Sequence, residues 1–257
     1  MARETRKQPQ KSRLRIWGGV GLLLLAAVTT AMAGRKVREF ALTDEQFHLS
    51  RSRAGALTVE GMKLTPRAKI QRVFATDFGR SIFAIPVDER RRRLLGIDWI
   101  EDASVSRVWP DRVVVRVRER TPVAFVSLRS GALLIDASGV LLDVPPQSHF
   151  TFPVLSGVRE DSSESARRDQ VGVFLQLQQE LGASAKDISE VNVADLDNIR
   201  VVTRIDRQAV ELMLGTSGFA PRYQNFLRHY SDIRRGSPGV TLFDLRLNNW
   251  ITAKAKD

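Results

Sequence analysis

An uncharged run of eighteen residues, at positions 16–33, constrains this chain more than any other feature. As a helix rising 1.5 Å per residue, the run would be about 27 Å long, close to the thickness of a bilayer's hydrocarbon core. We therefore expect a transmembrane helix over residues 16–33, preceded by a cytoplasmic tail over residues 1–15. The tail carries six basic side chains and one acidic side chain. This excess of positive charge predicts a cytoplasmic N-terminus and an exported remainder.

The same run has a second interpretation as a cleavable signal peptide. Ala31 and Ala33, followed by Gly34, match the small-x-small pattern of a cleavage site. The run is longer than a usual signal sequence, begins beside Trp17, and is followed at once by positive charge, which favours a retained anchor. Under both interpretations residues 34–257 leave the cytoplasm.

Composition narrows the classes of function. The net charge is +11, but much of it lies in the tail, and basic residues elsewhere alternate with acidic ones except at positions 90–93. A nucleic-acid partner is therefore not favoured. The absence of cysteine excludes disulfides and thiolate zinc sites. His48, His149 and His229 are far apart and no G-x-S-x-G motif is present, so an enzyme is the weaker class.

Residues 34–257 are long enough for two domains. After an irregular, charged juxtamembrane stalk over residues 35–53, the pattern predicts the order β-α-α-β-β, with a small sheet covered on one face by two helices. The expected elements are a strand at 56–59, helices opening at Thr65 and over 88–95, and strands over 103–108 and 112–119. The arginines at 90–93 are interpreted as the solvated face of the second helix.

The rest of the chain predicts a second α+β domain, with an antiparallel sheet and two helices. Its expected elements are two short strands around Ser138 and Gly139, a helix capped by Ser162 or Ser163 and ended by Gly182, strands over 188–193, 199–205 and 210–214, a helix over 219–233, and a final strand over 240–247. We expect the juxtamembrane stalk and the first domain over residues 34–120, and the second domain over residues 121–257.

Several motifs, taken in order, carry a family resemblance. Residues 99–124 include a Trp-Pro-Asp turn at 109–111 and end in Glu-Arg-Thr-Pro-Val-Ala. This run resembles the second half of the polypeptide-transport-associated (POTRA) domain in the FtsQ/DivIB family of bacterial cell division proteins. Further pieces similar to that family are Leu-Ile-Asp-Ala-Ser-Gly at 134–139, Phe-Pro-Val-Leu-Ser-Gly at 152–157, Leu214-Gly215, Phe226 with Tyr230, and Asp-Leu-Arg at 244–246.

The resemblance implies a partner-binding surface. An open sheet edge can accept an added strand, and the family uses its last strand and preceding helix in this way to bind FtsB and FtsL. The positions that match this surface are Arg246, Leu247, Asn249 and Trp250 on the last strand, Phe226 and Tyr230 on the helix, and Arg200 at the rim. Phe226 and Tyr230 also fit a role as core residues at helical spacing.

A second set of contacts is implied for the POTRA-like part. The positions that match the family's recruitment contacts are Val105, Arg107 and Glu119, and Val105 fits the core equally well. Further partners would be FtsK-like and other division proteins.

The function implied by the resemblance is a single-pass inner-membrane scaffold that is enriched at the division septum. It would have no catalytic residue, metal, cofactor or small-molecule substrate. Two other classes remain beside it: a different periplasmic POTRA adaptor in envelope assembly or secretion, and an enzyme acting on the cell wall. A POTRA-bearing outer-membrane pore would need many more lipid-facing strands than the C-terminal half offers.

Overall fold

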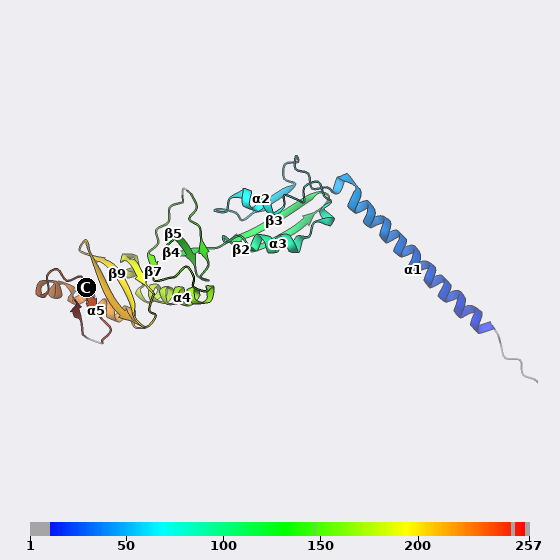
Figure 1. Ribbon diagram of the computed structural model, residues 1–257. Coiled ribbons are helices and arrows are strands. Elements are labelled where there is room, and N and C mark those ends of the chain that lie inside the picture. Colours follow the sequence, from blue (N-terminus) through cyan, green and yellow to red (C-terminus); the bar gives the residue numbers. More distant parts are fainter. Residues whose placement is uncertain (1–10, 147, 248–249, 255–257) are drawn as a thin grey trace, which may run out of the picture. The chain divides into compact units, whose positions relative to one another are not determined.

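The computed structural model describes residues 11–146, 148–247 and 250–254 (Figure 1). The described chain divides into two compact units. The first contains the residues up to Gly61 together with Arg67–Leu94 and Ala103–Val117. The second contains Met62–Pro66, Leu95–Asp102 and the described residues from Arg118 onward.

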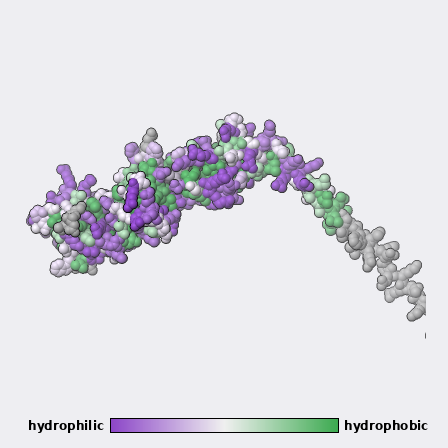
Figure 2. Space-filling model, in the orientation of Figure 1, coloured by the Kyte–Doolittle hydropathy of each residue, from purple (hydrophilic) through white to green (hydrophobic). Residues whose placement is uncertain are grey.

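The first unit begins with one long helix, α1 (Lys11–Thr43). The predicted irregular stalk is wrong in its first part, because α1 continues without a break through residues 35–43. Asp44 then caps a short 3-10 helix, η1 (Glu45–Phe47), by accepting a hydrogen bond from the backbone N–H of Gln46. In Figure 2 the described part of α1 changes from hydrophobic to hydrophilic along its length. Of the helices in the described part of the chain, none combines the length and apolarity that crossing a membrane requires.

The predicted β-α-α-β-β order of the first sheet is confirmed. Its elements are β1 (Leu57–Glu60), α2 (Arg67–Val73), η2 (Ile82–Ala84), α3 (Val87–Leu95), β2 (Ile100–Val108) and β3 (Arg112–Glu119). The sheet order is β1-β3-β2, and β1 runs parallel to β3. Val113, Val115 and Val117 of β3 are buried while the arginines at positions 112, 116 and 118 are exposed, as the alternation of the sequence predicts.

A buried ion pair joins α3 to the segment before η2. The Arg90 side chain is 4% exposed and donates to both carboxylate oxygens of Asp77, at 2.6 Å and 2.8 Å. The interpretation of residues 90–93 as a solvated face is therefore wrong for Arg90. Its exposed neighbours Arg92 and Arg93 follow the prediction.

The second unit is built on one mixed sheet. Over the described residues the strand order is β12-β11-β10-β9-β8-β7-β4-β5-β6. The strands are β4 (Pro122–Leu128), β5 (Gly131–Asp136), β6 (Leu141–Leu142), β7 (Val154–Ser156), β8 (Ile188–Asn192), β9 (Ile199–Ile205), β10 (Gln208–Gly215), β11 (Leu242–Asp244) and β12 (Thr252–Lys254). The predicted antiparallel sheet is corrected, because β4 with β7, β7 with β8, and β10 with β11 are parallel pairs.

Two helices complete the core of the second unit. They are α4 (Glu164–Leu181), which Ser163 caps, and α5 (Phe219–Gly236), and η3 (Gly182–Asp187) follows α4. The two helices contact each other (Figure 1). Their apolar faces share one cluster with the sheet. The buried helix side chains are Val171, Phe174, Leu177, Leu181, Phe219, Tyr223, Phe226 and Tyr230.

The end of the sheet differs from the predicted strand over residues 240–247. Strand β11 covers only Leu242–Asp244, and the chain then turns and returns as β12, antiparallel to β11. The returning strand was not predicted. Consequently β12, and not the predicted strand, lies at this edge of the sheet.

The Asp77 and Arg90 pair generates a stability prediction. Asp77→Asn removes the buried counter-charge of Arg90 and leaves it only the partly exposed Glu89, at 3.2 Å, and we expect unfolding to become easier by about 3–5 kcal/mol in urea melts. The matched control is Arg80→Ala, since Arg80 is half-exposed and lies 3.8 Å from the same carboxylate. The control should change stability by less than about 1 kcal/mol. Equal losses of stability in the two variants would contradict the attribution of this stability to the buried pair of Asp77 and Arg90.

Candidate partner-binding site

The free edge of the large sheet is formed by the short strand β12. Leu242 pairs with Lys254, Phe243 with Ala253, and Asp244 with Thr252. On either side of β11, the carbonyl of Thr241 and the N–H of Leu245 bond to β10. Because backbone polar groups alternate in direction along a strand, Leu242 and Asp244 must direct theirs toward β12.

The register then fixes the direction of the polar groups on β12. Residues opposite Leu242 and Asp244 form hydrogen-bonded pairs with them, so Thr252 and Lys254 bond inward. The N–H and C=O of Ala253 therefore point away from the sheet. This outward pair can bond to an added strand.

One carboxylate holds the turn between β11 and β12. Asp244 accepts from the backbone N–H of Arg246 at 3.1 Å and from its guanidinium at 2.9 Å and 2.7 Å. The ammonium of Lys254 lies 3.0 Å from the same carboxylate. Hydrogen bonding to Arg246, aided by Lys254, outweighs burial and holds the pKa of Asp244 well below its ordinary value. The carboxylate thus ties the start of the turn to the end of β12.

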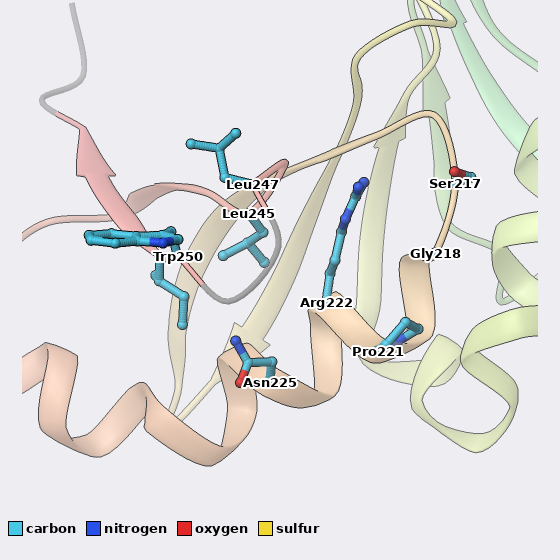
Figure 3. A pocket seen from close by; sticks show the side chains of 9 residues that line it. Ser217, Gly218, Pro221, Arg222, Asn225, Leu245, Leu247 and Trp250 are labelled. Atoms are coloured by element: carbon cyan, nitrogen blue, oxygen red, sulfur yellow. The ribbon is translucent and has the colours of Figure 1, made fainter.

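A hollow of about 490 Å³ lies beside this turn, between the start of α5 and the C-terminal segment. Its lining residues are Ser217, Gly218, Pro221, Arg222, Asn225, Leu245, Leu247, Trp250 and Ile251. Figure 3 shows Arg222 and Asn225 on α5, and Leu245, Leu247 and Trp250 on the C-terminal segment. Leu247 is 67% exposed and Trp250 is 72% exposed. An exposed Trp beside a hollow is the kind of anchor that partner surfaces favour.

The predicted contact residues of the C-terminal segment lie in the turn, not on a strand. Arg246, Leu247 and Trp250 all follow β11 and precede β12. The chain turns away from the sheet after Leu245, where the carboxylate of Asp244 bonds back to Arg246. Asn249 lies outside the described residues. The structure therefore brings Leu247 and Trp250 together at the hollow, with Arg246 bound to Asp244.

The two aromatic residues predicted on the helix belong to the core. Phe226 is fully buried and Tyr230 is 6% exposed. Their ring centroids are 5.4 Å apart, and the Phe226 ring lies 5.1 Å from that of Phe243 on β11. Phe226 and Tyr230 are therefore core residues, and of the two Phe226 packs directly against β11.

Arg200 lies on β9, three strands from the edge strand β12. Its guanidinium is 3.8 Å from the carboxylate of Glu211 on the neighbouring strand β10, and its side chain is 45% exposed. It remains available as a charged surface group, but it does not line the hollow.

The predicted contacts of the POTRA-like part have internal partners. Arg107 donates to the carbonyls of Ile82 and Ile85, both at 2.8 Å, and so fastens β2 to η2. Val105 on β2 is half-buried. Glu119 accepts hydrogen bonds from the backbone N–H groups of residues 63–65, at 2.7–3.1 Å. Burial opposes ionisation of Glu119, but the hydrogen bonds from Thr65, Leu64 and Lys63 outweigh it and lower the pKa of Glu119.

Sequence reasoning missed Arg222, Asn225 and the strand β12. Arg222 donates to the carbonyl of Leu214 and so lies between the end of β10 and the hollow. Its position four residues before Phe226 gave a usable signal, because residues on one helical face recur at this spacing. Strand β12 gave none, since Thr-Ala-Lys has no strand pattern.

Comparison with known proteins shows which family this chain resembles. The family profile "POTRA domain, FtsQ-type" matches residues 52–120, and the profile "Cell division protein FtsQ/DivIB, C-terminal" matches residues 124–246. The cell division protein FtsQ of Koribacter versatilis is 33% identical over 89% of this chain and 68% of its own length. That of Myxococcus fulvus is 24% identical over 92% of this chain and 81% of its own.

The carboxylate of Glu119 generates a prediction about pH. Its pKa is lower in the folded state, so its stabilisation is present above the unfolded value, near 4.5, and is lost as the pH falls through the folded value. We expect Glu119→Gln to reduce unfolding free energy by about 1–2 kcal/mol at pH 7. The difference from the natural chain should shrink below pH 4.5 in thermal melts. The control is Glu101→Gln, which removes an exposed partner of Arg118 and should have little effect. A stability difference between Glu119→Gln and the natural chain that did not change with pH would contradict a role for the charge of Glu119.

The carboxylate of Asp244 predicts a local effect. Asp244→Asn weakens the bonds to Arg246 and Lys254, so amides of β12 should exchange with deuterium faster at pH 7, by roughly fivefold for a loss of about 1 kcal/mol. Because the folded pKa is depressed, this stabilisation should be lost only as the pH falls below 3.8. Asp161→Asn is a matched control, since Asp161 pairs with Arg159 in the same two-residue spacing on an exposed surface. Unchanged exchange in β12 would show that Asp244 does not hold the edge.

Proposed function

Because this chain belongs to the FtsQ/DivIB family of cell division proteins, we propose that it is a division scaffold. It links early and late division proteins at the septum. Its work is binding, so it transfers no atoms and uses no cofactor. Its partners are membrane proteins of the FtsB and FtsL kind, with FtsK-like proteins as further contacts.

The proposed topology is that of a single-pass inner-membrane protein. Residues 1–15 lie in the cytoplasm, residues 16–33 cross the membrane, and the remainder lies in the periplasm. The uncharged run and the basic tail support this orientation. Residues 34–120 form the module that localises the protein, and residues 121–257 form the module that captures partners. Confinement to the membrane of its partners raises their effective concentration without any new contact.

Capture begins with strand addition to β12. The observation that carries this proposal is the outward N–H and C=O of Ala253 at the end of the large sheet. An extended partner segment bonds to these groups and lengthens the sheet by one strand.

Side chains beside the edge supply selectivity. Trp250 and Leu247 are exposed next to the hollow and offer apolar surface to the residues that continue the partner strand. Arg222 and Arg246 border the same region, so an acidic residue beside the partner's apolar ones is preferred. Main-chain bonds then give affinity, while the hollow and the arginines choose the partner.

The decisive experiment replaces Ala253 by proline. Proline removes the outward N–H and keeps the inward bonds of Thr252 and Lys254, a position at which a strand tolerates proline. We expect Ala253→Pro to reduce capture of the FtsB-like partner at least tenfold in pull-downs of the full chain, if roughly one main-chain bond worth about 1.4 kcal/mol is lost. Septation in cells that carry only the variant should weaken in parallel.

The matched control is Ala253→Val, which keeps the N–H and favours a strand. It should capture the partner as well as the natural chain does. Normal capture by Ala253→Pro, with the fold intact, would exclude strand addition at this edge. Loss of capture by both variants would point to the side chain instead of the backbone.

A further inference from the structure

An exposed aromatic patch lies where α1 meets the rest of the first unit. It consists of Phe40 on α1, Phe83 in η2, and Trp109 in the turn before β3, with Val108 next to Trp109 in the chain. The exposed fractions of the three rings are 53%, 44% and 69%. Partner capture at the far C-terminal segment makes no use of these side chains.

The aromatic patch is organised around one buried ring. Phe47 is 5% exposed, and its ring centroid lies 5.6 Å from that of Phe40, 5.4 Å from that of Phe83 and 6.4 Å from that of Trp109. The first two contacts are edge-to-face, a favourable geometry for aromatic pairs. The exposed rings thus form one surface, with Phe47 behind it.

Hydrogen bonds fasten this surface to the end of α1. The hydroxyl of Ser81, next to η2, donates to the carbonyl of Ala41 at 2.7 Å. The backbone N–H of Asp44 donates to the carbonyl of Phe40 at 3.0 Å. The aromatic patch therefore keeps a fixed place relative to the last turns of α1, in contrast to what a loose stalk would allow.

The sequence between the uncharged run and Phe40 places this surface at the depth of lipid headgroups. Phe40 lies seven residues beyond position 33, or about 10 Å along the helix axis. Helical side chains point back toward the N-terminus, so the ring covers the preceding turn. The headgroup layer extends roughly 5–8 Å beyond the hydrocarbon core, which brings the ring to its outer boundary.

The charges beside the aromatic patch match an anionic lipid surface. Arg35, Lys36 and Arg38 are exposed on the same helix, with Glu39 as the acidic residue among them. Aromatic rings that lie next to basic side chains are the combination that membrane interfaces favour. Basic side chains next to an anionic lipid surface are attracted to it.

We propose that the aromatic patch rests in the headgroup layer of the periplasmic leaflet and holds the first unit against the membrane. This inference rests on the proposed membrane anchor. It assigns Trp109 and Phe83 to lipid contact, a role separate from partner capture. The first unit then has a set orientation above the bilayer, which restricts the directions from which membrane partners can approach.

The test uses the absence of native cysteine. Single-cysteine variants of the full chain, Val108→Cys, Glu60→Cys and Leu23→Cys, are labelled with a nitroxide in vesicles of phosphatidylethanolamine with a minority of phosphatidylglycerol. Electron paramagnetic resonance then compares collisions with oxygen, which enters lipid, and with a water-soluble nickel chelate. Glu60 is an exposed strand residue away from the aromatic patch and serves as the aqueous control. Leu23 reports on the anchor itself.

The proposal predicts a several-fold higher ratio of oxygen to nickel collisions at position 108 than at position 60. Adding Trp109→Glu and Phe83→Glu should return the ratio at 108 to that at 60, while circular dichroism shows an unchanged fold. If the ratio of oxygen to nickel collisions at position 108 equals that at position 60 when Trp109 and Phe83 are unchanged, while the ratio at position 23 is that of the hydrocarbon core, this proposal alone is overturned. A collision ratio at position 23 as low as that at position 60 would show that residue 23 is in water, and would overturn the anchor and the lipid contact together. Protection at 108 that depends on protein density would assign the aromatic patch to a second copy and also overturn lipid contact.

Discussion

The carboxylate of Asp244 determines how the large sheet ends. Without its bonds to Arg246 and Lys254, nothing in the sequence Thr-Ala-Lys would keep a three-residue strand paired, because so short a segment buries little apolar surface. The same bonds turn the chain out of the sheet after β11. That turn sets Leu247 and Trp250 beside the hollow at the start of α5. One interaction therefore positions both the free backbone edge and its apolar neighbours.

The core beneath the edge makes this arrangement rigid enough to be useful. The Phe226 ring packs at a tilt against Phe243 of β11 and against Tyr230, and Leu245 is buried at the point where the turn begins. A preorganised edge lowers the entropy lost when a partner strand is ordered on it. In the proposed strand addition, these buried residues contribute through the strand that they support.

Local patterns predicted much of the fold but not its long-range pairings. The alternation of Val113, Val115 and Val117 and the Ser163 cap of α4 are encoded within a few residues, so they were predicted correctly. Arg90 has the same side chain as its exposed neighbours, and its burial depends on Asp77, thirteen residues away. Strands β7 and β12 are three residues long and become strands only through pairing. At the site, Trp250 and Leu247 were predicted from a family resemblance, whereas the outward direction of Ala253 requires the register.

The most direct test of strand addition follows amide hydrogen exchange at single residues of β12, in the full chain with and without the periplasmic segment of the FtsB-like partner. In the free protein, the amide of Ala253 should exchange fast while those of Thr252 and Lys254 are protected. Partner binding should slow Ala253 to the rate of its neighbours. Fast exchange of Ala253 in the saturated complex would contradict the account.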